Sequence, residues 1–171
     1  MSSVLIVSVM QELLKKNKDL ILRKWIAYGE GPSLSKREPH PLLNPASHII
    51  HTEWQEFYES LSDGNELCAA MLQETIRLKA IQQQSPSEAL SFIHELRNLI
   101  RQTTGNAEGM KELEVKLDKV LMESFDLYMK NRELIFKLKM EEYKRSLMPG
   151  GGVMSFSCSS KLGEPVEEAC S

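Results

Sequence analysis

The sequence predicts an all-α fold: a bundle of about five helices with a long C-terminal helix. Apolar side chains recur at three- and four-residue steps over most of the chain, and alternating β-branched runs are absent. Glycine is scarce inside these patterned segments, whose ends carry Gly, Pro, Asn and Asp signals. With 171 residues, 42% of them hydrophobic, the chain is long enough for one domain with a sizeable core.

The first predicted helix covers residues 5–28. Its apolar positions repeat from Leu13 to Tyr28, and Gly29 follows the last of them, where a C-terminal cap is expected. Three prolines exclude a regular helix over residues 30–43. We therefore expect a connecting loop there, which either crosses the bundle or covers a site.

Asn44 and Pro45 predict the start of a second helix, because Asn is a strong N-cap residue and Pro suits the first helical position. Apolar residues mark one face of this helix as far as Leu61, and Gly64 follows its predicted end. Residues 65–83 carry the same period and predict a third helix.

A capping box predicts where the fourth helix begins. Ser85 occupies the N-cap, Pro86 the first helical position and Glu88 the third. The Ser85 side chain can accept from the N–H of Glu88, and the Glu88 carboxylate can reach back to the N–H of Ser85. The helix is expected to run from this box to about Gly105.

The last predicted helix, residues 108–147, spans roughly 60 Å at 1.5 Å per residue, which exceeds the diameter of a small domain. One apolar stripe begins at Leu113, and a second stripe begins later. The second stripe consists of Met122, Phe125, Met129, Arg132, Phe136, Met140, Tyr143 and Leu147. We predict that one stripe faces the core and the other a partner; the alternative is a long core helix wrapped on both sides by its own chain.

Five side chains of the second stripe are the predicted partner surface, through which we expect a homodimer. They are Phe125, Met129, Phe136, Met140 and Tyr143. The sequence then divides into a helical domain over residues 1–147 and a flexible tail rich in Gly and Ser over residues 148–171.

Charge and composition narrow the class of protein. The 21 basic and 24 acidic residues leave a net charge of −3, which argues against a dedicated nucleic-acid binder. No apolar run approaches a membrane span, and none has the flanks of a signal peptide, so we expect no membrane insertion. Three cysteines, Cys68, Cys158 and Cys170, have no metal-ligand or redox spacing, which fits a reduced, cytoplasmic setting.

The sequence offers no constellation that would hold a reacting group, and we expect neither an enzyme nor a resident metal or cofactor. His48 and His51 share one helix face, but such pairs arise often by chance, so solvated or core-edge histidines are the favoured interpretation. The basic residues at the junction of the third and fourth helices are interpreted as solvated faces, with a small anionic pocket as the alternative. They are Arg77, Lys79, Arg97 and Arg101.

Three segments together resemble the RsbRD N-terminal domain family: "NPASH" (44–48), "LSDGNE" (61–66) and "IRLKAIQQQSPSEALSFIHELRNLIR" (76–101). The third is the most specific of the three. In it Arg77, Lys79, Ala80 and Gln82 match the pattern of the third helix, and Ser85, Pro86, Ser87, Ala89 and Phe92 match that of the fourth. The resemblance covers about residues 11–145.

The resemblance implies a regulatory role. Domains of this family lie at the N-terminus of stress-response co-antagonist proteins and of some signalling kinases, and pass a signal along a helical linker. Related sensor domains are globin-like without haem and form dimers. It also suggests Arg77, Lys79 and Gln82 as a shared signalling surface. No STAS output domain or kinase follows the final helix in this sequence, so we expect a stand-alone version.

The sequence therefore predicts a non-enzymatic sensory or regulatory domain in signal transduction, which binds itself and an unidentified partner protein through its last helix. One alternative is a helical bundle that binds a small ligand, haem or lipid in an apolar pocket formed by Trp54, Met71 and Phe92. Another is an accessory subunit of a larger redox assembly.

Overall fold

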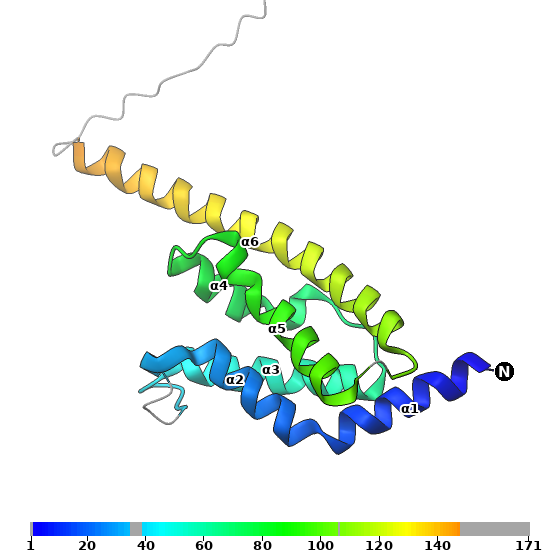
Figure 1. Cartoon of the computed structure of the whole chain (residues 1–171). Helices are drawn as coiled ribbons and strands as arrows, with labels where there is room; N and C mark the ends of the chain where they lie inside the picture. The colour runs from blue at the N-terminus through cyan, green and yellow to red at the C-terminus, as the bar shows by residue number, and fades with distance from the viewer. Residues whose placement is uncertain (1, 35–38, 106, 148–171) are drawn as a thin grey trace, which may run out of the picture. The chain divides into compact units, whose positions relative to one another are not determined.

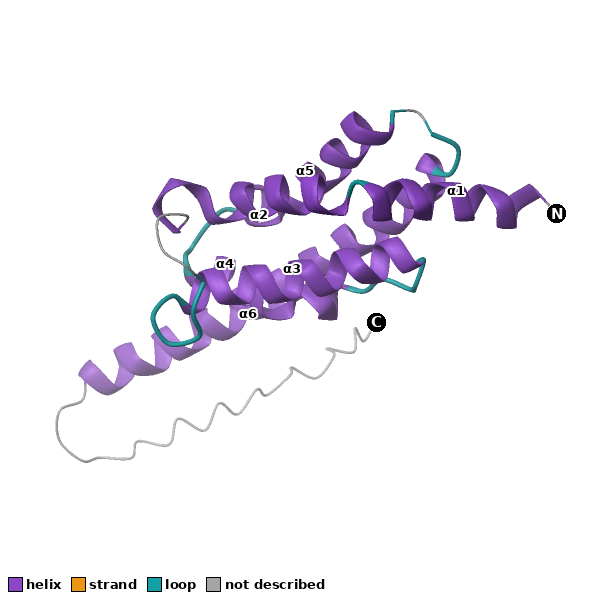
Figure 2. Cartoon of the chain, turned by 90° about the horizontal axis from the view of Figure 1, so that it is seen from below, coloured by secondary structure: helices purple, strands orange, loops and turns teal. Residues whose placement is uncertain are grey.

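The described part of the chain is almost entirely helical. The computed structural model describes the backbone of residues 2–34, 39–105 and 107–147, and their side chains except at 2–8 and 32–34. These residues form no named β-strand, and Figures 1 and 2 show only helices and connecting loops. The helices are α1 (Ser2–Lys16), α2 (Lys18–Leu34), α3 (Pro45–Asp63), η1 (Ala69–Leu72), α4 (Gln73–Ile81), α5 (Pro86–Thr104) and α6 (Met110–Leu147), η1 being a 3-10 helix. The all-α prediction is confirmed; the predicted tail, with Cys158 and Cys170, lies outside the described residues.

The prediction of one first helix over residues 5–28 is wrong, because the chain forms two helices that meet at Asn17. Figure 1 shows α1 and α2 joined at an angle. The Asn17 side chain donates to the Leu13 carbonyl, with 2.9 Å between Nδ2 and the oxygen. A side chain that competes for the carbonyl four residues earlier bends a helix. The Tyr58 hydroxyl of α3 donates to the next carbonyl, that of Leu14, at 3.0 Å.

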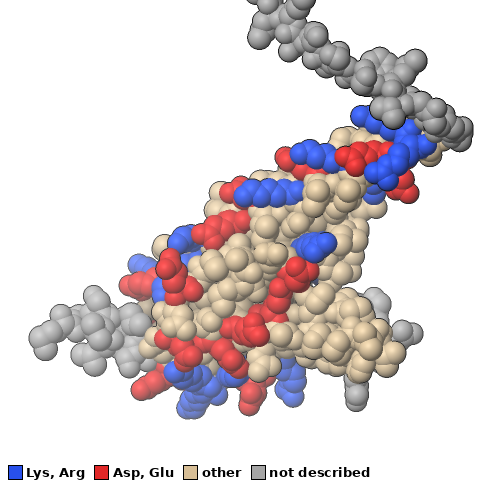
Figure 3. Space-filling view, turned by 180° about the vertical axis from the view of Figure 1, so that it is seen from behind, with Lys and Arg blue, Asp and Glu red and all other residues tan. Residues whose placement is uncertain are grey.

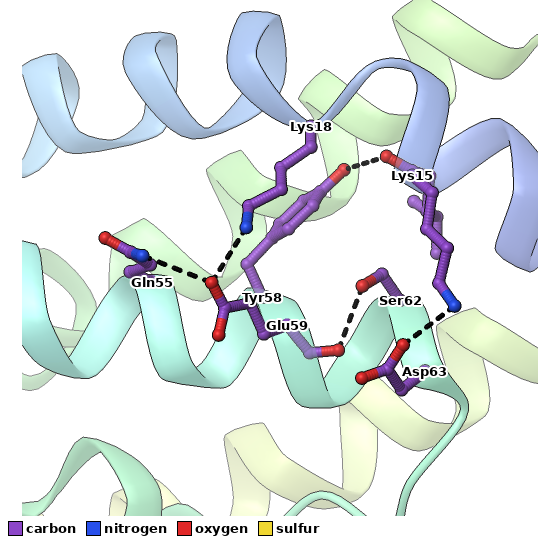
Figure 4. Close-up of polar contacts among 8 residues, drawn as sticks. Lys15, Lys18, Gln55, Tyr58, Glu59, Ser62 and Asp63 are labelled. Carbon is purple, nitrogen blue, oxygen red and sulfur yellow. Dashed lines mark hydrogen bonds and ion pairs between the residues drawn. The ribbon is translucent and has the colours of Figure 1, made fainter.

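Ion pairs on both sides of this bend attach it to α3 (Figure 4). Lys15 lies 2.8 Å from Asp63, and Lys18 lies 2.7 Å from Glu59. The hydrogen bond from Lys18 lowers the pKa of the Glu59 carboxyl, whereas burial raises the pKa of the Tyr58 phenol. Both ion pairs are open to water, so they contribute little to stability. The buried Tyr58 contact is the stronger constraint on the angle between α1 and α2.

Gly29 does not cap the end of α2, contrary to the prediction. The helix continues to Leu34, with a non-helical residue at Gly31, where φ is 61°. Gly29 is buried instead, and a Cβ added there would lie 2.0 Å from Cη2 of Trp54. The absence of a side chain therefore allows the backbone of α2 to lie directly against the ring of Trp54.

Three aromatic rings from three helices form the centre of the core. Trp25 of α2 stacks on Trp54 of α3 with 4.3 Å between ring centroids, and Trp54 stacks on Phe92 of α5 at 4.8 Å. The Trp25 indole N–H donates to the Phe92 carbonyl at 2.7 Å, so its polar atom is satisfied inside the core. All three rings are buried. Apolar side chains from α1, α4, α5 and α6 surround them.

The predicted third helix over residues 65–83 is also wrong in its first half. Residues 65–68 are not helical, and the chain then forms η1 and α4. The Glu53 carboxylate of α3 accepts from the N–H groups of Glu74 and Thr75, both at 2.8 Å. The Glu123 carboxylate of α6 accepts from the N–H of Ala69 at 3.1 Å. These carboxylates come from other helices and accept from N–H groups that would otherwise be unpaired at the starts of η1 and α4. The sequence of residues 65–83 alone therefore does not indicate where these helices begin.

The predicted loop over residues 30–43 begins too early, because α2 includes residues up to Leu34. The predicted ends of α3 and the predicted start of α5 are confirmed. Asn44 caps α3 by accepting from the Ser47 N–H, and Gly64 ends α3 in a left-handed conformation with φ of 78°. Both halves of the Ser85–Glu88 capping box are present at the start of α5. Between these ends α2 packs against α3 and α5, while α3 also contacts α1 and α4.

Helix α6 has a different environment along its length. Within the compact unit, which ends at Lys137, one face is buried. Its buried residues are Met110, Leu113, Leu117, Val120, Ser124 and Tyr128. The residues from Leu138 to Leu147, described by themselves, form a helix whose side chains are all exposed.

Substitution of Gly29 by alanine tests the close contact with Trp54. We expect the free energy of unfolding to fall by roughly 1–3 kcal/mol, because the new methyl group overlaps the indole ring. Chemical denaturation measures it. Ala27→Ser, at an exposed site two residues earlier, should change stability by less than about 0.5 kcal/mol. Trp54→Phe should reduce the cost of Gly29→Ala, and an equal cost in both backgrounds would contradict the contact.

Candidate functional site

The predicted partner surface on α6 is exposed. Phe125, Met129, Phe136, Met140 and Tyr143 have between 38% and 65% of their surface accessible. Three further exposed apolar side chains fall on the same sequence spacing, and we name the eight residues together the α6 stripe. The three further residues are Val115, Met122 and Leu147.

The α6 stripe lies on a different side of the helix from the buried face. At about 100° per residue, the stripe residues from Val115 to Phe136 are centred roughly 130° away from the buried line that runs from Met110 to Tyr128. The predicted second stripe began at Met122 and did not include Val115, which lies one heptad earlier. A strict seven-residue step from Val115 through Met122, Met129 and Phe136 is the signal that identifies it.

An apolar groove continues the α6 stripe toward α5. It has a volume of 540 Å³ and includes Leu90 and His94 of α5 together with Leu121, Met122 and Phe125 of α6. Exposed contiguous apolar surface of this kind is typical of interaction sites rather than of a free surface.

Charged side chains surround the apolar surface without a basic patch. The face drawn in Figure 3 carries groups of acidic side chains and groups of basic side chains, with uncharged surface beside them. Along α6, exposed acidic residues at Asp126 and Glu133 precede exposed basic residues at Lys137 and Lys144. The mixed signs give no local support for nucleic-acid binding.

A second feature is an open cleft of 810 Å³ that we name the α2–α5 cleft. Its walls are the end of α2, the last turn of α4, the α4–α5 turn and the first two turns of α5. Of the predicted signalling surface, Lys79 and Gln82 line this cleft. Arg77 is exposed elsewhere on α4 and lies 3.7 Å from Glu74 in an ion pair.

Lys79 has an unusual setting in the cleft. Its ammonium lies 3.4 Å from the Gly29 carbonyl, and none of the described carboxylates forms an ion pair with it. Burial lowers the pKa of Lys79 because the charged form loses water contacts. The ammonium therefore has donor capacity that the described residues do not fill.

Two side chains of α6 hold the segment that forms one wall of the cleft. The Tyr128 hydroxyl donates to the Gln84 carbonyl, and Arg132 donates to the Ala80 carbonyl at 3.3 Å. Between these points Gln83 takes a left-handed conformation with φ of 58°, which ends α4. The α4–α5 turn thus connects the cleft to the part of α6 that carries Met129.

The remaining basic residues of the predicted cluster point away from the cleft and pair with α6. Arg97 lies 3.0 Å from Asp118, and Arg101 pairs with Glu114. The four basic residues therefore do not form one anionic pocket. The ion pairs of Arg97 and Arg101 instead attach α5 to α6.

The other sequence candidates occupy structural positions. His51 contacts the Glu30 carboxylate at 3.0 Å, and no group of His, Cys, Asp and Glu among the described residues could hold a metal ion. The proposed apolar pocket is filled, because Trp54 and Phe92 stack directly and Met71 packs beside the core.

None of the described helices is long and apolar enough to cross a membrane. No family model, curated protein or solved structure matches the chain.

The capping box at the edge of the cleft gives a pH-dependent contribution to stability. Hydrogen bonds from the Ser85 hydroxyl and N–H lower the pKa of the Glu88 carboxyl below its ordinary value of 4.5. Because the folded pKa is the lower one, this stabilisation is fully present above about pH 4.5 and is lost as pH falls through the folded pKa. Wild type should exceed Glu88→Gln in stability at neutral pH, and the difference should shrink as pH falls below about 4.5.

Denaturation of both proteins across this pH range measures the effect. In a Ser85→Ala background, Glu88→Gln should cost less, because the hydroxyl partner is already gone. A difference that stayed constant with pH would show that the carboxylate charge does not take part in the cap.

Proposed function

We propose that this chain is a non-enzymatic sensory or regulatory domain in a reduced, cytoplasmic setting, and that it pairs with a second copy through the α6 stripe. The observation that carries the proposal is the second apolar face of α6, which is exposed beside the buried residues from Met110 to Tyr128 and also after them. Regular apolar spacing over several helical turns is typical of helix pairing.

The charges beside the α6 stripe favour an antiparallel second copy as the occupant. Asp126 and Glu133 are seven residues apart, and so are Lys137 and Lys144. In an antiparallel pair, the acidic segment of each copy meets the basic segment of the other. The same alignment sets Met129 of one copy opposite Met140 of the other.

The contacts of the α4–α5 turn support a route from a signal to the dimer. Tyr128 and Arg132 bind carbonyls of α4 and the turn, and Met129 lies between them on α6. A rearrangement of the turn would change the position of this part of α6 and so the pairing of the stripe. Ligands or partners that favour one pairing would shift the population of states.

The resemblance to the RsbRD N-terminal domain family supports the same proposal, since its related sensors form dimers and signal through helices. It rests mainly on residues 76–101, which include Lys79, Gln82 and the capping box. The competing hypothesis is that the chain is an accessory subunit of a larger assembly and that the same apolar face contacts another subunit.

A charge placed in the α6 stripe should separate the copies. Wild type is expected to have the mass of a dimer at high micromolar concentration in multi-angle light scattering. Phe136→Glu should give a monomer, because pairing would bury two unpaired carboxylates. The apparent dissociation constant should rise by at least about 100-fold, or roughly 2.7 kcal/mol.

The matched control is Leu134→Glu. Leu134 lies on the same helix with 55% of its surface exposed, but on the other side from the α6 stripe. This variant should remain a dimer, and both variants should keep the wild-type circular dichroism. A wild-type protein that is monomeric at high micromolar concentration would refute the homodimer and leave a different partner for the stripe.

A further inference from the structure

The α2–α5 cleft has the features of a binding site for a small molecule. Its volume of 810 Å³ falls within the range of ligand pockets. Phe92, which belongs to the buried aromatic stack, forms part of its floor. The cleft is thus adjacent to the buried aromatic stack, and a ligand there would contact a closely packed surface.

Lys79 is the group in the cleft that lacks an opposite charge. The two carboxylates of the lining are already engaged. Glu30 accepts from Ser47 and contacts His51, and Glu88 accepts from Ser85. The ammonium of Lys79 has only the distant Gly29 carbonyl among its described contacts. An anionic group of a ligand is the partner that would complete it.

The charge of the ligand is limited by the same carboxylates. Glu30 and Glu88 both line the cleft, so a doubly charged phosphate would be repelled more than a singly charged carboxylate. The rest of the lining is rich in groups that both donate and accept hydrogen bonds, among them Gln82, Gln84 and Ser87. Such groups match hydroxyls on the body of the ligand.

We propose that the α2–α5 cleft binds a small organic monocarboxylate that carries hydroxyl groups. Its carboxylate contacts the ammonium of Lys79, and its hydroxyls contact the side chains of Gln82, Gln84 and Ser87. This binding is a property of one copy of the chain and does not depend on pairing through the α6 stripe.

Titration with sodium D-gluconate at constant ionic strength tests the proposal. The reporter is the indole N–H resonance of Trp25, which donates to the Phe92 carbonyl next to the cleft. A molecule of this size is expected to bind with a dissociation constant of about 1 mM. D-Glucitol, which lacks the carboxylate, and inorganic phosphate should each bind at least about tenfold more weakly.

Lys79→Met keeps the aliphatic stem and removes the charge, so it should weaken gluconate binding by at least about tenfold. Arg77→Met is the matched control on the same helix, and its affinity should stay within about twofold of wild type. In wild type, gluconate should also raise the pKa of the Lys79 ammonium, measured by NMR of labelled lysine. This readout decides the question if the Lys79 variant does not fold.

Three results would overturn the proposal: no saturable shift with gluconate up to about 50 mM, equal affinity in Lys79→Met, or phosphate or glucitol binding as tightly as gluconate. An unchanged Lys79 pKa at saturating gluconate would likewise refute contact with the ammonium.

Discussion

The contact of Gly29 with Trp54 is the constraint on which the arrangement of the bundle depends. It brings the backbone of α2 onto the ring of α3, and that ring in turn stacks on Phe92 of α5. The hydrogen bond from the Trp25 indole to the Phe92 carbonyl joins α2 directly to α5. Since the end of α2 and the start of α5 form opposite walls of the α2–α5 cleft, the stack also sets its width.

Helix α6 contributes one face to this core. It also carries the α6 stripe, which none of the described residues cover. Tyr128 on its buried face reaches the α4–α5 turn, whereas Met129, one residue later, faces outward. A helix with two apolar faces can pack in the core of one copy and contact another copy at the same time, so a change in the core can alter the contact between copies. The same physical arrangement is what the proposed signalling requires.

Local signals in the sequence were sufficient for the helix starts whose capping partners are close in the chain. The Ser85–Glu88 capping box and the Asn44 cap are examples, and periodic spacing likewise identified the α6 stripe. For the predicted signalling surface, helical geometry separates Arg77 from Lys79 by roughly 160° around the helix and leaves Gln82, three residues further, beside Lys79. The structure agrees with this division.

The bend at Asn17 involves a local hydrogen bond to the Leu13 carbonyl, whereas the other failures arise because distant side chains decide local structure. Glu53 and Glu123 begin α4 and η1 from other helices, and no pattern within residues 65–83 announces them. Gly29 looks like a cap because its neighbours are periodic, but its role depends on Trp54, which belongs to another helix. Tertiary contacts override local propensity in these other cases.

Antiparallel pairing of the α6 stripe can be observed directly through its methionine methyl groups. Met122, Met129 and Met140 belong to the stripe, whereas Met10 and Met110 are buried in the core. In methyl-labelled protein diluted from about 1 mM to about 10 µM, we predict that the stripe resonances shift and the core resonances do not. Mixed labelling should show a contact between Met129 of one copy and Met140 of the other. Stripe resonances that are independent of concentration, with no contact between copies, would contradict the account.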